Sequence, residues 1–140
     1  MAAAAWSSSA SAAVETLHPY LSSFGSFSNV QGVATDAAGD VYVFDAGAGT
    51  IFKFDAAGNP VNFAATGTNE ITGLGAGGPS ENEIAVDRST GPTAGDIYLA
   101  NGSRSAVQIF SPAGSSLATL IPEEGIPWEG EACGVAVDPN

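Results

Sequence analysis

An acidic cluster near the end of the sequence is the group of residues best suited to chemistry. Glu123, Glu124, Glu129 and Glu131 surround Trp128 in the stretch PEEGIPWEGEAC. Carboxylate oxygens are ligands for a hard cation such as calcium, and an exposed tryptophan can stack on a sugar or on an aromatic group of a partner. The carboxylate spacing matches no known calcium loop. The alternative is a solvated loop whose tryptophan packs into a neighbouring structural unit. We expect no cofactor, and calcium is the candidate if this cluster binds an ion.

Few other residues in the sequence could form a catalytic centre. His18 is the only histidine and Cys133 the only cysteine, so one chain can build neither a histidine-paired nucleophile nor a multi-cysteine metal site. We expect Cys133 to be a small buried apolar residue. The stretch GLGAGG at 73–78 has the Gly-x-Gly-x-x-Gly spacing of dinucleotide sites, but no strand leads into it. We interpret it as a connection between structural units, and no catalytic residue is predicted.

Charge and composition narrow the class of partner. Three Lys and Arg against fifteen Asp and Glu give a net charge of −12, which should repel a phosphate backbone, so no nucleic acid partner is expected. No apolar run approaches the roughly 18 residues of a membrane-spanning helix, so membrane insertion is not expected. The 18 Gly and 8 Pro, with only 13% charged residues, favour short strands joined by tight turns.

Residues 1–16 form a low-complexity leader made mostly of Ala and Ser. Ala10, Ser11 and Ala12 fit the small-x-small pattern of a signal-peptidase site, but the basic and apolar regions that should precede it are missing. The leader is therefore either a remnant of a signal peptide or a disordered segment. Together with a composition similar to that of extracellular proteins of GC-rich bacteria, it indicates an extracellular or cell-surface location, with a folded part at 17–140.

An internal repeat organises the folded part. GVATD, beginning at Gly32, recurs as EIAVD at 83–87 and as GVAVD beginning at Gly134, at a constant spacing of 51 residues. GDVYV at 39–43 recurs as GDIYL at 95–99, and FDAAG at 54–58 recurs as FSPAG at 110–114. Self-similarity at a fixed period of this length is the signature of a repeat architecture. The recurring aspartates, Asp36, Asp87 and Asp138, are expected to cap the next turn through side-chain to backbone hydrogen bonds.

Each repeat contains short strand-like segments. DVYVF and TIFKF are rich in β-branched and aromatic residues and are bounded by turn residues. In TIFKF, Ile51 and Lys53 should lie on one face of the strand and Phe52 and Phe54 on the other. Fourth strands are predicted at 61–65 and 116–121. GVAVD shows no polar alternation, so we expect the first strand of each unit to be buried on both sides.

The glycosylation sequon that begins at Asn101 falls between two of these strands. Asn-Gly is a common hairpin turn, which explains the sequence without a sugar.

These motifs resemble the NHL-repeat family of β-propellers, which usually have six blades. VFDAGAGTIFKFDAAGN is similar to the family's Val-Ala-Asp-x-Gly-Asn-x-Arg-Ile-x-x-Phe-Asp core, with Asp45 and Gly47 on its Asp and Gly, while Asn101 stands at the Asp position of the second unit. The resemblance covers 21–140. It implies blades at 32–65 and 83–121, the first strand of a next blade at 134–138, and the outer strand of a preceding blade at 20–27.

The predicted fold class is therefore all-β, with propeller blades of four-stranded antiparallel sheets in an incomplete ring. A closed propeller needs at least about four blades, so the chain should be part of a longer protein or complete itself as a homo-oligomer. We expect a non-catalytic extracellular binding or structural scaffold that acts through a protein partner or self-association. The alternative implied by the resemblance is a propeller enzyme of the lactonase or lyase type, with a metal on the axis held at the ends of the inner strands.

Overall fold

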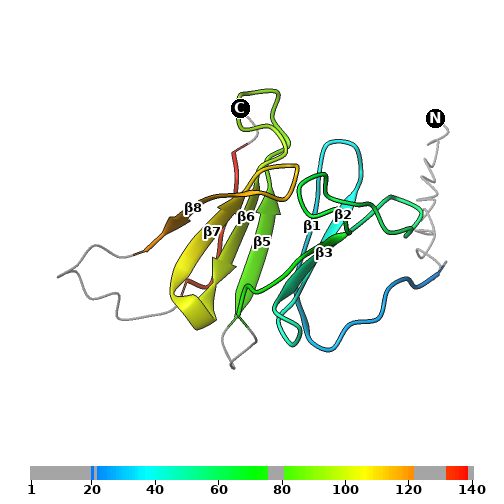
Figure 1. Cartoon of the computed structure of the whole chain (residues 1–140), viewed down its shortest axis with the longest axis horizontal. Coiled ribbons are helices and arrows are strands. Elements are labelled where there is room, and N and C mark those ends of the chain that lie inside the picture. The colour runs from blue at the N-terminus through cyan, green and yellow to red at the C-terminus, as the bar shows by residue number, and fades with distance from the viewer. Residues whose placement is uncertain (1–19, 21, 76–80, 122–131, 139–140) are drawn as a thin grey trace, which may run out of the picture.

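The computed structural model describes residues 20, 22–75, 81–121 and 132–138. These residues form two antiparallel four-stranded sheets, so the predicted all-β class is confirmed, and they close no ring (Figure 1). The first sheet contains β1 (Val30–Thr35), β2 (Val41–Asp45), β3 (Thr50–Phe54) and β4 (Glu70–Ile71). The second contains β5 (Asn82–Val86), β6 (Ile97–Asn101), β7 (Ala106–Phe110) and β8 (Ser116–Leu120), with a 3-10 turn at Gly102–Arg104. Each strand pairs with the next along the chain.

The sequence repeat is also a repeat of strand register. Ala34 in β1 pairs with Tyr42 in β2, and Ala85 and Tyr98, at the same repeat positions, pair in the second sheet. The pair Val41–Phe54 likewise corresponds to the pair Ile97–Phe110. Because register decides which side chains share a face, equivalent residues of the two sheets lie on equivalent faces.

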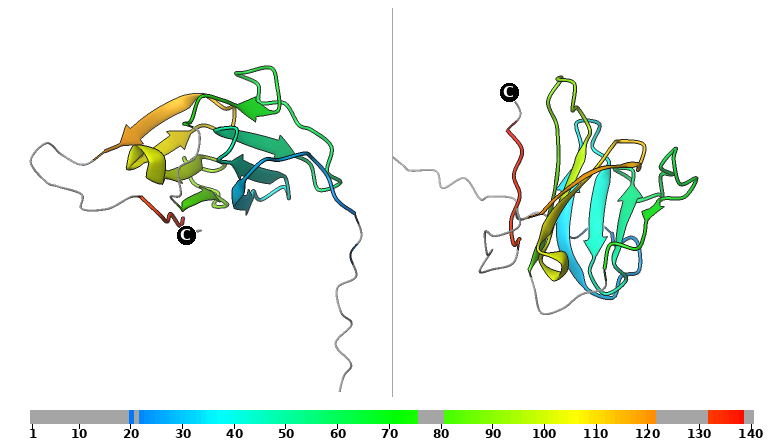
Figure 2. Two further views of the ribbon diagram at one scale, coloured as in Figure 1. Left: turned by 90° about the horizontal axis from the view of Figure 1, so that it is seen from below. Right: turned by 60° about the vertical axis from the view of Figure 1, so that its left-hand side comes forward.

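The hydrophobic core lies between the two sheets, which pack face to face (Figure 2). We call the side of each sheet that lines this core its core face and the opposite side its outer face. The first sheet contributes Tyr42, Phe44 and Ile51, and the second contributes Ile84, Val86, Ile97, Leu99 and Phe110. Tyr42 lies on a core face, whereas its equivalent Tyr98 lies on the outer face of the second sheet. The two sheets therefore stack head to tail, with unlike faces in contact.

Strands β1 and β5 lie side by side at one edge of this stack. A Cβ added to Gly32 would lie 3.0 Å from Cγ2 and 3.1 Å from the backbone nitrogen of Ile84. A side chain at position 32 would therefore push Ile84 away by a few tenths of an ångström, so glycine favours this close approach of the two strands.

The fourth strand of the first sheet differs from the prediction. It lies at Glu70–Ile71, not at 61–65, where the chain forms a loop after an isolated bridge between Phe54 and Pro60. Phe63 in that loop is 1% exposed, because it turns into the core and packs against Tyr42 and over Gly114 of the second sheet. Phe63 of the predicted strand instead serves this contact between the sheets. The other predicted fourth strand is present as β8.

Two further predicted strands are absent, although both segments lie beside a sheet. Residues 22–27 contain no strand and run beside the first sheet, and residues 132–138 contain no strand and approach β5. Burial of the first strand on both sides is wrong for β1, because Val33 is 60% exposed on the outer face. Cys133 is exposed, contrary to its predicted burial. In the part of the chain described here, no helix has the length and apolar character needed to cross a membrane.

Replacing a core leucine should be far more costly than replacing a surface leucine of the same sheet. Leu99 is fully buried between the sheets and Leu117 is 55% exposed. Leu99→Ala is expected to lower the free energy of unfolding by about 2–5 kcal/mol, and Leu117→Ala to change it by less than about 0.5 kcal/mol. Urea denaturation measures both. Equal effects of the two substitutions would contradict a core placed between the sheets.

Candidate functional site

An open pocket of about 520 Å³ lies where the starts of β1 and β5 meet. The propeller-enzyme alternative expects its metal ligands at the ends of the inner strands, and this pocket lies at one end of two such strands. It is lined by Gln31, Gly32, Val33, Glu81, Asn82, Glu83 and Cys133. Its polar groups are therefore two carboxyls and two amides, a set of oxygen ligands that suits a hard cation or a polar ligand.

Part of this polar lining is used in holding the sheets together. The Asn82 side-chain nitrogen donates to Gln31 Oε1, which links β5 to β1. The Asn82 side-chain oxygen accepts from the Gly102 backbone nitrogen at 2.9 Å. Glu83 accepts from the Val135 backbone nitrogen at 3.2 Å, which holds the segment 132–138 near the pocket. Among the residues that the structure describes, no group of three or more His, Cys, Asp or Glu is placed to hold a metal ion.

The Asp45 carboxylate, near this end of the first sheet, accepts several hydrogen bonds. Asp45 is 2% exposed and ends β2. Its carboxylate accepts from the backbone nitrogens of Ser28, Asn29 and Gly47 at 2.7, 2.9 and 2.9 Å, and from Ser28 Oγ at 2.8 Å. Burial alone would raise the pKa of Asp45, but the hydrogen bonds outweigh burial and lower the pKa to about 2. The ionised carboxylate thus fixes the segment before β1 to the β2–β3 turn.

Asn101 replaces this aspartate in the second sheet, and its surroundings explain the replacement. Its side-chain nitrogen donates to the Leu74 carbonyl and, at 2.9 Å, to Gln108 Oε1. A carboxylate could not donate to these two acceptors. The predicted Asn-Gly turn is wrong in detail: Asn101 is the last residue of β6, the connection is the 3-10 turn Gly102–Arg104, and the Asn101 side chain is only 1% exposed. Its side-chain oxygen is buried without a hydrogen-bond partner in the described structure.

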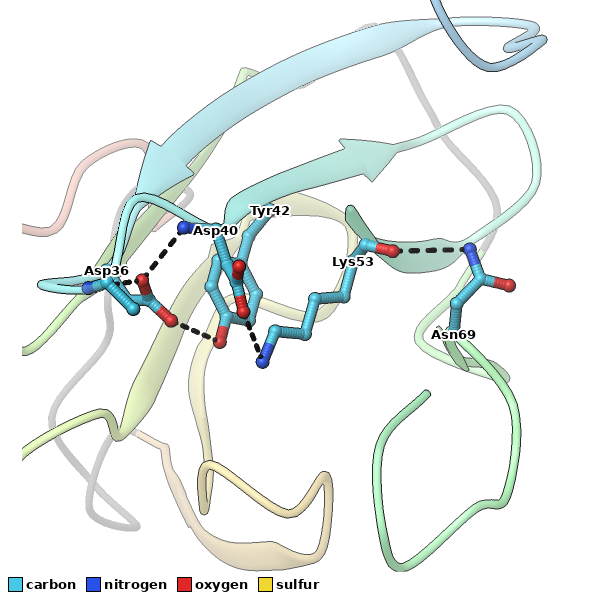
Figure 3. A network of polar contacts seen from close by, with 6 residues as sticks. Asp36, Asp40, Tyr42, Lys53 and Asn69 are labelled. Carbon is cyan, nitrogen blue, oxygen red and sulfur yellow. Dashed lines mark hydrogen bonds and ion pairs between the residues drawn. The ribbon is translucent and has the colours of Figure 1, made fainter. Parts of the chain in front are cut away.

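A second polar network lies at the opposite end of the first sheet (Figure 3). The Tyr42 hydroxyl donates to Asp36 at 3.1 Å, and Lys53 pairs with Asp40 at 2.9 Å. The Lys53 ammonium also lies 5.3 Å from the centroid of the Tyr42 ring, a cation–π distance. Burial raises the pKa of Tyr42 to about 12, so this hydroxyl stays protonated at neutral pH. The network links the β1–β2 turn to β2 and β3.

The aspartates that end β1 and β5 make the predicted turn-capping bonds. Asp36 accepts from the Ala38 and Asp40 backbone nitrogens at 2.9 and 3.0 Å. Asp87 accepts from the Ser89 backbone nitrogen at 2.7 Å and from Thr93 Oγ1 at 2.6 Å.

In the second sheet Ile109 stands at the repeat position of Lys53, so the network there lacks its cation. Burial, followed by the charge of Asp87, raises the pKa of Asp96.

The remaining predicted residues divide between those the structure describes and those it does not. Glu123, Glu124, Trp128, Glu129 and Glu131 lie outside the described residues, so a calcium or stacking role there stays a prediction. Asp138 is exposed, and Gly134 lies against the Glu83 carboxylate.

Sequence reasoning missed two features of the first sheet. The Lys53 ion pair joins β3 to Asp40 in the turn before β2, and the segment around Phe24 packs its ring against Phe54 of β3 without forming a strand.

The carboxylate of Asp45 should make stability depend on pH in the acid range. Because its folded-state pKa of about 2 lies below the ordinary value of 3.8, its contribution is complete above about pH 4 and is lost as the pH falls towards 2. Asp45→Asn is expected to lower the free energy of unfolding at pH 7 by about 1–3 kcal/mol and to flatten the acid limb. Denaturant unfolding between pH 2 and 7 measures this, with Glu81→Gln, at an exposed carboxyl, as the control. An unchanged acid limb in Asp45→Asn would contradict the assignment.

Comparison with known proteins adds no identification. No protein-family model matches the sequence, and no curated protein matches it. The function is therefore argued from the geometry of the chain itself.

Proposed function

We propose that this chain is a non-catalytic binding or structural scaffold made of stacked NHL-like propeller units, which works after further units join it. The two sheets share one register and one internal repeat, and they stack through unlike faces. Stacking through unlike faces is a heterologous contact, which can be repeated until a ring closes or a filament grows. A scaffold of this kind needs no catalytic group.

One observation carries this proposal. The repeat positions at which β1 and β5 approach each other also bring residues 132–138 into contact with β5. β5 approaches β1 through Ile84, whose backbone nitrogen lies close to Gly32. Val135 is the repeat equivalent of Ile84, and Glu83 is the equivalent of Gly32. The Val135 backbone nitrogen donates to Glu83 at 3.2 Å. The contact with the Glu83 side chain holds residues 132–138 near β5, and we propose that they mark the position of a third unit.

The outer face of the second sheet supports the same proposal. Leu120 in β8 pairs with Val107 in β7, and Val107 pairs with Ala100 in β6, so these apolar residues share that face with Tyr98. Leu120 is 54% exposed, and Ile121 beside it is 67% exposed. Tyr98 is equivalent to Tyr42, which is buried under a neighbouring sheet. Repeat units bury such faces against their neighbours, and we propose a second copy of the chain as the occupant.

An extracellular location is part of the proposal. It is supported by the Ala- and Ser-rich residues 1–16 and by the overall composition. Recognition of a protein partner would then use the loops at the ends of the stack and the exposed apolar residues of the second sheet.

Self-association of the purified chain tests this function. Light scattering is expected to give a mass above the 13.9 kDa of one chain that rises with concentration. Leu120→Asp places a charge on the docking face and should shift the chain towards the monomer. Thr90→Asp, in an exposed loop, is the matched control and should leave the mass unchanged. A wild-type chain that stays monomeric at millimolar concentration would contradict self-association.

A second candidate function, an enzyme of the lactonase or lyase type, is favoured by the pocket at the starts of β1 and β5. Glu81 and Glu83 bring two carboxyls to the strand ends where an axial metal would bind. If this function holds, the purified protein should contain about one calcium or zinc ion per ring, and Glu83→Gln should lose it. Elemental analysis measures the metal. A metal-free wild-type protein after purification with calcium and zinc would count against the enzyme.

A further inference from the structure

An aromatic segment of the chain lies on the outer face of the first sheet. Residues 22–29 precede β1 and pass the first sheet on the side away from β5 to β8 (Figure 1). The rings of Phe24 and Phe54 lie 5.1 Å apart, and those of Phe27 and Phe52 lie 5.6 Å apart, between centroids. Phe52 and Phe54 point to the outer face because they alternate with the core-facing positions of β3. The segment thus covers a face that no sheet covers.

The contact of Phe24 with the first sheet has a counterpart inside the chain. A Cβ added to Gly58, at a φ of 85°, would lie 2.8 Å from Phe24 Cβ. A Cβ added to Gly114, at a φ of 86°, would lie 2.8 Å from Phe63 Cβ. Gly58 and Gly114 occupy the same repeat position. Each sheet therefore receives a phenylalanine over the same turn glycine, where a side chain would block it.

The other end of the segment is fixed by polar contacts. The Asp45 carboxylate accepts from the backbone nitrogens of Ser28 and Asn29 and from Ser28 Oγ. A Cβ added to Gly47 would overlap Ser28 Oγ, so a second glycine leaves room for the segment. The first sheet thus offers an apolar surface at the β3 end and a buried acceptor at the end of β2, and an extended segment spans both.

We propose that the outer face of the first sheet is a binding site for an extended segment of the form Phe-x-x-Phe-Ser-Asn. The chain's own residues 22–29 fill it here, and the same segment of a second copy fills it when the chain's own segment leaves. This deepens the proposed scaffold function, on which it rests, by naming a surface and a ligand through which one chain joins another. Exchange of identical elements between protomers is a low-cost route to assembly.

Peptide binding in solution tests the site. The probe is a fluorescent peptide of residues 22–29, and the receptor is the full chain carrying Phe24→Ser and Phe27→Ser, which release its own segment. Anisotropy is expected to show binding of one peptide per chain. The affinity should be at least about tenfold higher than for the wild-type chain, in which the tethered segment competes at an effective concentration in the millimolar range. A peptide with both phenylalanines replaced by serine should not bind.

A second variant tests the polar end of the site. Adding Gly47→Ala to the Phe24→Ser, Phe27→Ser chain leaves Phe52 and Phe54 unchanged, but its Cβ would overlap the serine of the peptide, so binding should weaken. Adding Asp45→Asn to the Phe24→Ser, Phe27→Ser chain should weaken binding, because the buried acceptor is lost. Leu117→Ser, which removes an exposed leucine elsewhere, is the control and should bind like wild type. Circular dichroism checks that each receptor is folded.

The outcomes separate this site from the scaffold function. If the folded Phe24→Ser, Phe27→Ser receptor does not bind the peptide, the site is overturned, even when the wild-type chain self-associates. If the peptide binds at one per chain while the wild-type chain stays monomeric at every concentration, the site is supported and self-association fails.

Discussion

Face-to-face packing of the two sheets is the interaction on which the rest of the structure depends. Strands of five residues bury little surface by themselves, and the main core cluster is buried where the two sheets meet. Burial of one large apolar side chain contributes about 1.5–3 kcal/mol, so this contact is a major source of stabilising free energy. Phe63 shows how far the contact controls the chain. Its burial over Gly114 of the second sheet sets the loop that displaces the fourth strand to Glu70–Ile71.

Head-to-tail stacking leaves each sheet with one face that its neighbour does not cover. The first sheet covers much of its outer face with residues 22–29, through Phe24, Phe27 and the bonds to Asp45. The second sheet keeps Leu120 and Ile121 exposed. The two sheets also differ in their polar residues. Lys53 pairs with Asp40 in the first sheet, whereas Ile109 stands at the position of Lys53 in the second, where Asp96 lies near the charge of Asp87.

Much of the architecture could be predicted from the sequence because the repeat constrains it. A 51-residue spacing of equivalent aspartates, with period-two alternation in β3, sets the pairing register and the faces of the strands. The capping bonds of Asp36 and Asp87 are local, so residue type and position predict them. The strand expected at 61–65 and the burial expected for Cys133 were wrong, because both depend on neighbours distant in the chain. The aromatic segment was mistaken for a strand for the same reason.

The sequence by itself determined the all-β class, the repeat, the turns and the alternation of faces, since these follow from residue type and short-range geometry. Only the tertiary structure decided which face of each sheet became the core, that Asp45 would bind a segment 16 residues earlier, and that Asn101 would need to donate where its equivalent accepts. The physical reason is that burial and hydrogen-bond partners belong to pairs of segments. Alternation along one strand assigns its side chains to two faces, but the segment that packs against the strand decides which face is buried.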